Sequence, residues 1–180
     1  MDYTLNTERL ILQPLSELEF DFIHQLSKRP EYNEFERDKA KSHEEVMENC
    51  QKYINGAKKL PNEGAIQWII LSNNVKIGEV HIKCNWEETH EWEIGWNLLN
   101  EYWGKGFASE ATRAAIKYGF IHFRIRRLIA LLHAENKRSE ALAERVGMVK
   151  EGRLRENRLI KGKYYDEYIF GILKHEVISV

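Results

Sequence analysis

Two glycines flank a lysine in the stretch "EYWGKGFASEAT", residues 101–112, directly ahead of a segment with helical periodicity. The backbone N–H groups at the start of a helix have no intrahelical partner, and the helix dipole makes that end attractive to anions. Glycine lacks the Cβ that would hold a phosphate away, and it accepts positive φ. With the cation of Lys105 beside them, Gly104 and Gly106 predict an anion-binding loop whose ligand carries phosphate.

Two common phosphate-binding motifs do not fit this loop. A P-loop has four residues between its glycines followed by Lys-Ser/Thr, which "GKGFAS" lacks. A dinucleotide-binding fingerprint needs an acidic residue about 20 residues further on, where this chain reads the basic "RIRRLI". A glycine turn between a strand and a helix, without any ligand, stays open as the alternative.

The size and charge of the chain narrow the class of protein. Its 180 residues predict one domain, and a formal net charge of -1 argues against a nucleic-acid-binding protein that relies on a basic surface. The first ten residues lack the parts of a signal peptide, and no apolar run approaches the ~20 residues of a membrane helix. Cys50 and Cys84 lie far apart, without metal-binding spacing. We therefore expect a cytoplasmic, metal-free protein that binds neither nucleic acid nor membrane.

Hydrophobic periodicity and capping residues predict an alternation of strands and helices. Ser16 is a plausible N-cap, and Ser42 with Glu45 forms a capping box for a helix that stops near Gly56. The expected elements, in chain order, are a strand over 8–15, helices over 17–26 and 43–56, an antiparallel meander over 65–72, 75–84 and 91–99, a helix over 107–123, a strand over 127–134, a helix over 138–146, and a hairpin of 148–157 with 163–173. This order predicts a mixed sheet with one strand–helix–strand crossover in its middle.

Five quoted segments together resemble one enzyme family. "EIGWNLLNEYWGKGFASEA" followed by "ENKRSEALAERVGMVKEG" resembles the GNAT superfamily of acetyl-CoA-dependent N-acetyltransferases, most closely the ribosomal-protein-alanine N-acetyltransferase branch. "TERLILQPL", "IGEVHI" and "YYDEYIFGIL" extend the resemblance over nearly the whole chain. It implies a single N-acetyltransferase domain over 1–180. The implied fold is α/β (mixed α+β), with a mostly antiparallel twisted sheet of about seven strands, splayed between the fourth and fifth and flanked by about four helices.

The resemblance also implies where acetyl-CoA, the expected co-substrate, binds. The backbone amides of the glycine loop are expected to hold the pyrophosphate, although Trp103 stands where the family pattern has Gln or Arg. The end of the preceding strand is expected to pair with the pantetheine arm, and an asparagine to contact the cofactor near its thiol. The implied cofactor-binding residues are Leu98, Leu99, Gly104, Lys105, Gly106, Phe107, Ala108, Asn136 and Ser139.

Acetylation of an amine needs a base for the amine and an acid for the leaving thiolate. Glu93, on the strand that is expected to splay, is the first candidate for the base, with Glu101 and His81 as further candidates. Their alternatives are an exposed carboxylate and a structural histidine. Many members of the family protonate the thiolate with a tyrosine seven residues after the asparagine, where this chain has Ala143. The resemblance therefore points to Ser139 as the acid, with a helix cap as its alternative role.

These residues lead to three hypotheses for the function. The first is acetyl-CoA-dependent acetylation of a primary amine, chiefly a protein N-terminal α-amine of the ribosomal-protein type, by direct attack in a ternary complex. The second is the same chemistry on a small amine such as a polyamine, an antibiotic or an amino-acid-like amine. The third is a catalytically silent CoA-binding module. An aromatic run that includes Tyr164 and Phe170 could pair two copies into a homodimer, and the sequence leaves this open.

Overall fold

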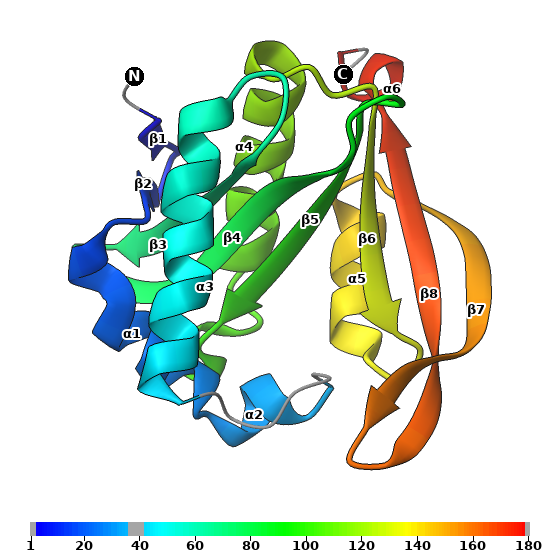
Figure 1. The fold of residues 1–180 in the computed structure, drawn as a ribbon, viewed down its shortest axis with the longest axis horizontal. Helices are drawn as coiled ribbons and strands as arrows, with labels where there is room; N and C mark the ends of the chain where they lie inside the picture. Colours follow the sequence, from blue (N-terminus) through cyan, green and yellow to red (C-terminus); the bar gives the residue numbers. More distant parts are fainter. Residues whose placement is uncertain (1–2, 36–41, 179–180) are drawn as a thin grey trace.

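The computed structural model describes residues 3–35 and 42–178 (Figure 1). The helices and strands, in chain order, are β1 (Leu5–Asn6), β2 (Ile11–Pro14), α1 (Phe20–Ser27), α2 (Pro30–Asn33), α3 (His43–Gly56), β3 (Ala65–Ser72), β4 (Val75–Trp86), β5 (Glu91–Leu98), α4 (Phe107–His122), β6 (Arg127–His133), α5 (Lys137–Arg145), β7 (Val149–Ile160), β8 (Lys163–Leu173) and α6 (Lys174–Ile178). Short 3₁₀ turns lie at Glu17–Glu19, Ala57–Lys59 and Asn100–Tyr102. The expected order of elements is confirmed, and β1, α2 and α6 are additions to it.

Eight strands form one mixed sheet in the order β1-β2-β3-β4-β5-β6-β8-β7. The expected number was about seven, and the extra strand is the two-residue β1, which pairs with β2 through Leu5 and Leu12. Every neighbouring pair is antiparallel except β5 and β6, which are parallel because α4 forms the crossover between them. The predicted mixed fold is therefore confirmed.

The strands β5 and β6 pair along only three residues. Their register joins Glu91 to Arg127, Trp92 to Leu128 and Glu93 to Ile129. Beyond Glu93 the two strands diverge, as Figure 1 shows, while β5 continues to Leu98 and β6 to His133. The sheet thus has an unpaired strand edge in its interior, where backbone groups need another partner.

Helices cover both faces of the sheet. On the face that carries α1 and α3, a smaller core forms around Phe20, Val46 and Ile69. On the opposite face α4 buries a stripe that includes Ala115 and Phe120 against the central strands, within the main core. The small side chains of α4 bring its backbone close to the sheet, so the N-terminus of this helix has a fixed position beside the end of β5.

An ion network holds the sheet together where β5 and β6 are still paired. Arg127 Nε donates to Glu91 Oε2 at 3.0 Å, and Arg127 Nη1 donates to Glu151 Oε1 at 2.6 Å. The Glu151 carboxylate lies over Gly171 of β8, where a Cβ atom would come within 2.6 Å of Oε1. The network therefore links β5, β6 and β7 across β8, next to the point where the strands begin to separate.

Local signals for the ends of elements agree with the structure. The predicted capping box of Ser42 with Glu45 is present at the start of α3, and the predicted N-cap Ser16 forms a second capping box with Glu19 ahead of α1. The β7–β8 hairpin turns at Lys161 and Gly162, which both have positive φ. In the aromatic run of β8, Phe170 is fully buried whereas Tyr164 is 59% exposed. No helix among residues 3–35 and 42–178 is long and apolar enough to cross a membrane.

Candidate active site

A cavity of about 680 Å³ lies where β5 and β6 have separated. Its walls come from four parts of the chain: the end of β5, the loop and first turn of α4, the first turns of α5, and the segment of α1 and α2. Of the predicted site residues, Leu98, Leu99, Gly104, Gly106, Phe107, Ala108, Asn136 and Ser139 line this cavity. The described residues include no group of three His, Cys, Asp or Glu side chains that could hold a metal ion.

The glycine loop has the conformation of an anion-binding site. Gly104 and Gly106 adopt φ values of +73° and +81°, and Gly106 is the N-cap of α4 without any side-chain cap. No acceptor in the described part of the chain takes up the backbone N–H groups of residues 104–109. These amides lie at the positive end of a 16-residue helix. The residues present therefore fit a phosphate group at this wall of the cavity.

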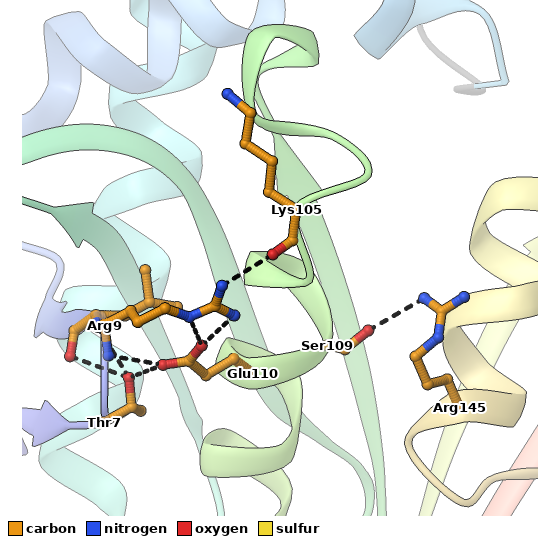
Figure 2. Close-up of polar contacts among 7 residues, drawn as sticks. Thr7, Arg9, Lys105, Ser109, Glu110 and Arg145 are labelled. Carbon is orange, nitrogen blue, oxygen red and sulfur yellow. Dashed lines mark hydrogen bonds and ion pairs between the residues drawn. The ribbon is translucent and has the colours of Figure 1, made fainter.

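The N-terminal segment of the chain fixes this loop (Figure 2). Arg9 Nε donates to Glu110 Oε2 at 2.7 Å, and Arg9 Nη1 donates to Lys105 O at 3.0 Å. Thr7 Oγ1 donates to the other carboxylate oxygen of Glu110 at 2.6 Å. Partial burial acts to raise the pKa of Glu110, but the hydrogen bonds from Thr7 and Arg9 outweigh it and leave this pKa below its ordinary value. The carboxylate is thus ionised and joins the loop to the strand region ahead of β2.

The charge of Lys105 is turned away from the cavity, which corrects one part of the prediction. Lys105 Nζ donates to Glu101 O at 2.8 Å, lies 5.2 Å from the ring centre of Tyr102, and is not part of the cavity wall. Figure 2 shows its ammonium pointing away from Ser109. The side chain of Lys105 is therefore not part of the cavity wall, and a role of its backbone amide in cofactor binding stays a prediction.

Three of the four cations in the cavity wall come from α5, and the fourth is Arg29. The three from α5 are Lys137, Arg138 and Arg145. Arg145 Nη1 donates to Ser109 Oγ at 3.3 Å, and the Arg138 guanidinium lies 4.2 Å from the ring centre of Trp103. The basic residues of "KRSEALAER" were the available signal for this, but the sequence did not indicate that they face the glycine loop.

The open edge of β5 presents backbone groups to the cavity. The Leu99 N–H donates to Ile77 O of the β4 side at 2.8 Å, so Leu99 turns its amide away from the gap. Because backbone directions alternate along a strand, Trp96 and Leu98 turn theirs toward the gap. The Leu98 carbonyl already accepts Trp103 Nε1–H at 2.8 Å. Of the two residues predicted to pair with the pantetheine arm, only Leu98 faces the gap with its backbone, and Trp96 is the second residue that does so.

The start of α5 brings Asn136 and Ser139 to the opposite wall. Asn136 is the N-cap of α5, and its Oδ1 accepts the backbone N–H of Ser139 at 3.1 Å. The capping role that was the alternative for Ser139 therefore belongs to Asn136. Ala143, where many members of the family have a tyrosine, is fully buried. Ser139 is the one residue with a hydroxyl group among the residues of α5 that line the cavity.

The predicted base candidates lie outside the cavity wall. Glu93 Oε1 pairs with Lys83 Nζ at 3.1 Å and Glu93 Oε2 accepts from Asn85 at 3.1 Å, so its carboxylate is already occupied. His81 lies beside Glu79, 3.0 Å from Nδ1 to Oε2, and Glu101 pairs with Arg29 at 3.2 Å. The geometry does not support Glu93 as the group that takes the proton directly.

Two further polar residues line the cavity although the sequence did not single them out, Glu31 of α2 and Asn97 of β5. Asn97 occurs in a strand that the sequence located correctly, but strand alternation alone does not say which edge residues meet a ligand. Glu31 belongs to the charged segment between α1 and α3, in which no periodicity indicates a single residue. Only the tertiary arrangement puts both at the same cavity.

Comparison with known proteins agrees with this arrangement. The family described as "Acetyltransferase (GNAT) domain" matches residues 9–149. An N-acetyltransferase of Bacillus licheniformis, p20, is 31% identical over 173 residues, which cover 96% of this chain and 97% of that protein. A spermidine N(1)-acetyltransferase of Vibrio cholerae is 27% identical over 95% of this chain and 96% of that protein.

The fold has a close counterpart among solved structures. RimL, a ribosomal L7/L12 alpha-N-protein acetyltransferase in complex with coenzyme A, superposes with a TM-score of 0.85 and 21% identity, covering 94% of this chain and 97% of that one. The chain belongs to the acetyltransferase (GNAT) family. The protein is accordingly an acyltransferase, an N-acetyltransferase that uses acetyl-CoA.

Proposed function

We propose that this enzyme transfers the acetyl group of acetyl-CoA to the N-terminal α-amine of a protein, in the cytoplasm, by direct attack within a ternary complex. The observation that carries the cofactor part is the row of unpaired amides in residues 104–109, in the wall of a cavity that continues to the open edge of β5. The acceptor part rests on the charges of that cavity.

The charges in the cavity wall favour an acceptor with a single positive charge. Among the described residues the wall contains four cations and one carboxylate, Glu31. A polyamine carries three or four positive charges and is matched by several carboxylates. An α-amine has a pKa of about 7.7 to 8.0, against about 10.4 for a lysine-type amine, so a larger share of it is neutral at physiological pH. An N-terminal α-amine therefore needs less help from a base.

Each wall of the cavity has a role in this proposal. The amides of Gly106, Phe107 and Ala108 hold the pyrophosphate, with Arg145 as a neighbouring cation. The outward backbone groups of Trp96 and Leu98 align the pantetheine arm as an added strand would be aligned. Acetyl-CoA supplies the acetyl thioester and a thiol leaving group.

Leaving-group assistance comes from α5. The Ser139 hydroxyl donates a hydrogen bond to the departing sulfur, and Asn136 orients the same end of the cofactor. A thiol has a pKa of about 8.5, so the thiolate is a good leaving group. It needs little assistance from an acid, and a weak acid suffices. The amine loses its proton to water that enters between β5 and α2, since the carboxylate of Glu93 is occupied by Lys83.

The test combines cofactor binding with acceptor selection. Acetyl-CoA is titrated calorimetrically, and thiol release is then followed with Ala- and Ser-starting peptides, the same peptides with a blocked N-terminus, spermidine and an aminoglycoside. We expect kcat/KM to be at least tenfold higher for the free peptides than for the small amines, and no release with the blocked peptides. Higher kcat/KM for spermidine would replace the proposed acceptor by the second candidate.

That second candidate, a small amine, is favoured by one observation. The V. cholerae relative that matches along 95% of this chain is a spermidine N(1)-acetyltransferase. If acetyl-CoA binds but no amine in the panel causes thiol release, the result would support the third hypothesis, a silent CoA-binding module.

A further inference from the structure

One carboxylate in the cavity wall has an oxygen atom without a hydrogen-bond partner among the described residues. Glu31 lines the cavity from α2, and its Oε1 atom is buried without a hydrogen-bond partner in the described residues. A buried carboxylate oxygen without a partner is costly, and such a group in a native structure needs an explanation, for example a catalytic role or a ligand that reaches it. The neighbouring cation Arg29 donates to Glu101 Oε1 at 3.2 Å.

The other charged groups of the wall belong to the phosphate side or to other partners. Lys137 and Arg145 come from α5, which faces the loop ahead of α4. Arg138 pairs with Glu34 at 2.9 Å. Glu31 is the one carboxylate among the described wall residues, and it comes from the segment between α1 and α3, which also contributes Arg29. Three of the four wall cations therefore come from α5, whereas the carboxylate comes from the segment between α1 and α3, an arrangement that suits an anionic cofactor and a cationic acceptor.

A second acceptor of hydrogen bonds lies in the same wall. Asn97 Nδ2 donates to Glu79 Oε1 at 2.6 Å, and Glu79 is only 3% exposed. Glu79 Oε2 also accepts from Gln67 Nε2 at 3.2 Å and contacts His81 Nδ1 at 3.0 Å. One N–H of the Asn97 amide is committed to this carboxylate, and Oδ1 of the same amide can accept a hydrogen bond from a ligand in the cavity.

We propose that Glu31 binds the ammonium group of the acceptor, with Asn97 Oδ1 as a second acceptor for its N–H groups. An ammonium group has three donors and one positive charge, which suits a carboxylate and an amide oxygen supported by the buried charge of Glu79. The inference deepens the proposed function, on which it rests: it makes Glu31 the residue that selects a cationic amine at the start of the reaction.

The test uses the full-length protein with saturating CoA, so that acceptor binding is measured without turnover. The probes are an Ala-starting tetrapeptide, the same peptide with an acetylated N-terminus, and spermidine, each titrated calorimetrically. Glu31→Gln keeps the size of the side chain and removes its charge. Glu48→Gln, at an exposed site on α3, removes one charge elsewhere and serves as the matched control.

We expect Glu31→Gln to weaken binding of the free peptide by about 10- to 100-fold, as loss of a partly buried charge-assisted pair does. Binding of the blocked peptide and of CoA should change less than twofold, and Glu48→Gln should behave as the wild type. Unchanged CoA affinity also shows that the variant is folded.

Three results would overturn the assignment of Glu31. These are a change below twofold for the free peptide, an equal loss for the free and blocked peptides, and no binding of either ammonium probe to the wild type. Failure of the proposed function gives a different result. The wild type then binds an ammonium probe and the Glu31→Gln variant does not, yet no peptide causes thiol release from acetyl-CoA. In that case the ammonium site stands and the proposed reaction does not.

Discussion

Arg9 donates through Nε to Glu110 Oε2 at 2.7 Å, and so joins two residues that lie 101 positions apart in the chain. The same guanidinium donates to the carbonyl of Lys105, within the loop that precedes α4. One side chain therefore holds both the first turn of α4 and the glycine loop in place (Figure 2). The unpaired amides of that loop owe their fixed direction to a residue from the beginning of the chain.

Replacing Glu110 by Gln should loosen this loop. We expect the free energy of unfolding to fall by about 1 to 2 kcal/mol, because the charged hydrogen bonds from Arg9 and Thr7 are weakened in a partly buried place. The Kd for CoA should rise about three- to tenfold, since the amides are no longer held in one orientation. Chemical denaturation and calorimetry measure the two effects. Glu8→Gln, exposed and nearby, is the control, and an equal effect there would contradict the prediction.

The Glu110 carboxylate also gives stability a defined pH dependence. Its pKa is lower in the folded protein than in the unfolded chain, so its contribution is fully present above the unfolded value of about 4.3. The contribution is lost as the pH falls through the lower, folded pKa. The difference in unfolding free energy between the wild type and Glu110→Gln should therefore be constant from pH 8 to 6 and shrink below about pH 4.3. A difference that stays constant down to pH 3 would show that ionisation of Glu110 is not involved.

The glycine at the N-cap of α4 can be tested with an internal control. Gly106 and Gly162 have the same φ of +81°, so an alanine should cost each about 1 kcal/mol of stability. At Gly106 the new Cβ would also lie 3.3 Å from Arg9 Nη2, whereas nothing lies within 4 Å at Gly162. We expect Gly106→Ala to raise the Kd for CoA at least tenfold and Gly162→Ala to leave it unchanged. Equal affinities in both variants would make the loop a plain turn.

The roles of Ser139 and Asn136 can be tested separately, because Asn136 caps α5 with its side chain and Ser139 takes part in that cap only with its backbone N–H. The cap of α5 is Asn136 Oδ1, so Asn136→Ala should destabilise the protein by about 1 kcal/mol, whereas Ser139→Ala should change its stability by less than about 0.5 kcal/mol. If the Ser139 hydroxyl assists the leaving thiol, Ser139→Ala should lower kcat by about 10- to 100-fold with little effect on KM. An unchanged kcat would leave protonation of the thiolate to water.

Glu93 provides the complementary test. Its carboxylate pairs with Lys83 at 3.1 Å outside the cavity wall, so Glu93→Gln should change kcat by less than about threefold. A pH–rate profile of the variant should keep the same lower limb as the wild type. Loss of that limb, together with a large fall in kcat, would restore Glu93 as the base that the sequence suggested.

Much of the fold follows from local patterns. The β-rich run "AIQWIILS" predicted β3 at its observed bounds, and the Ser42–Glu45 capping box predicted the start of α3. These signals are local because propensity, capping and turn conformation depend on neighbours in the chain. The two-residue β1 and the four-residue α2 were not predicted, since elements of that length have no periodicity to detect.

The sequence by itself determined the kind of site: a glycine loop at a helix start, a crossover between parallel strands, and the segments shared with a family of acetyltransferases. The tertiary structure decided which side chains reach it. It turns Lys105 away, brings Arg145 to the loop, leaves Glu93 paired with Lys83, and puts Glu31 in the wall. The reason is physical: charge and hydrogen-bonding capacity belong to a residue type, but direction and distance come from packing between segments that are far apart in the chain.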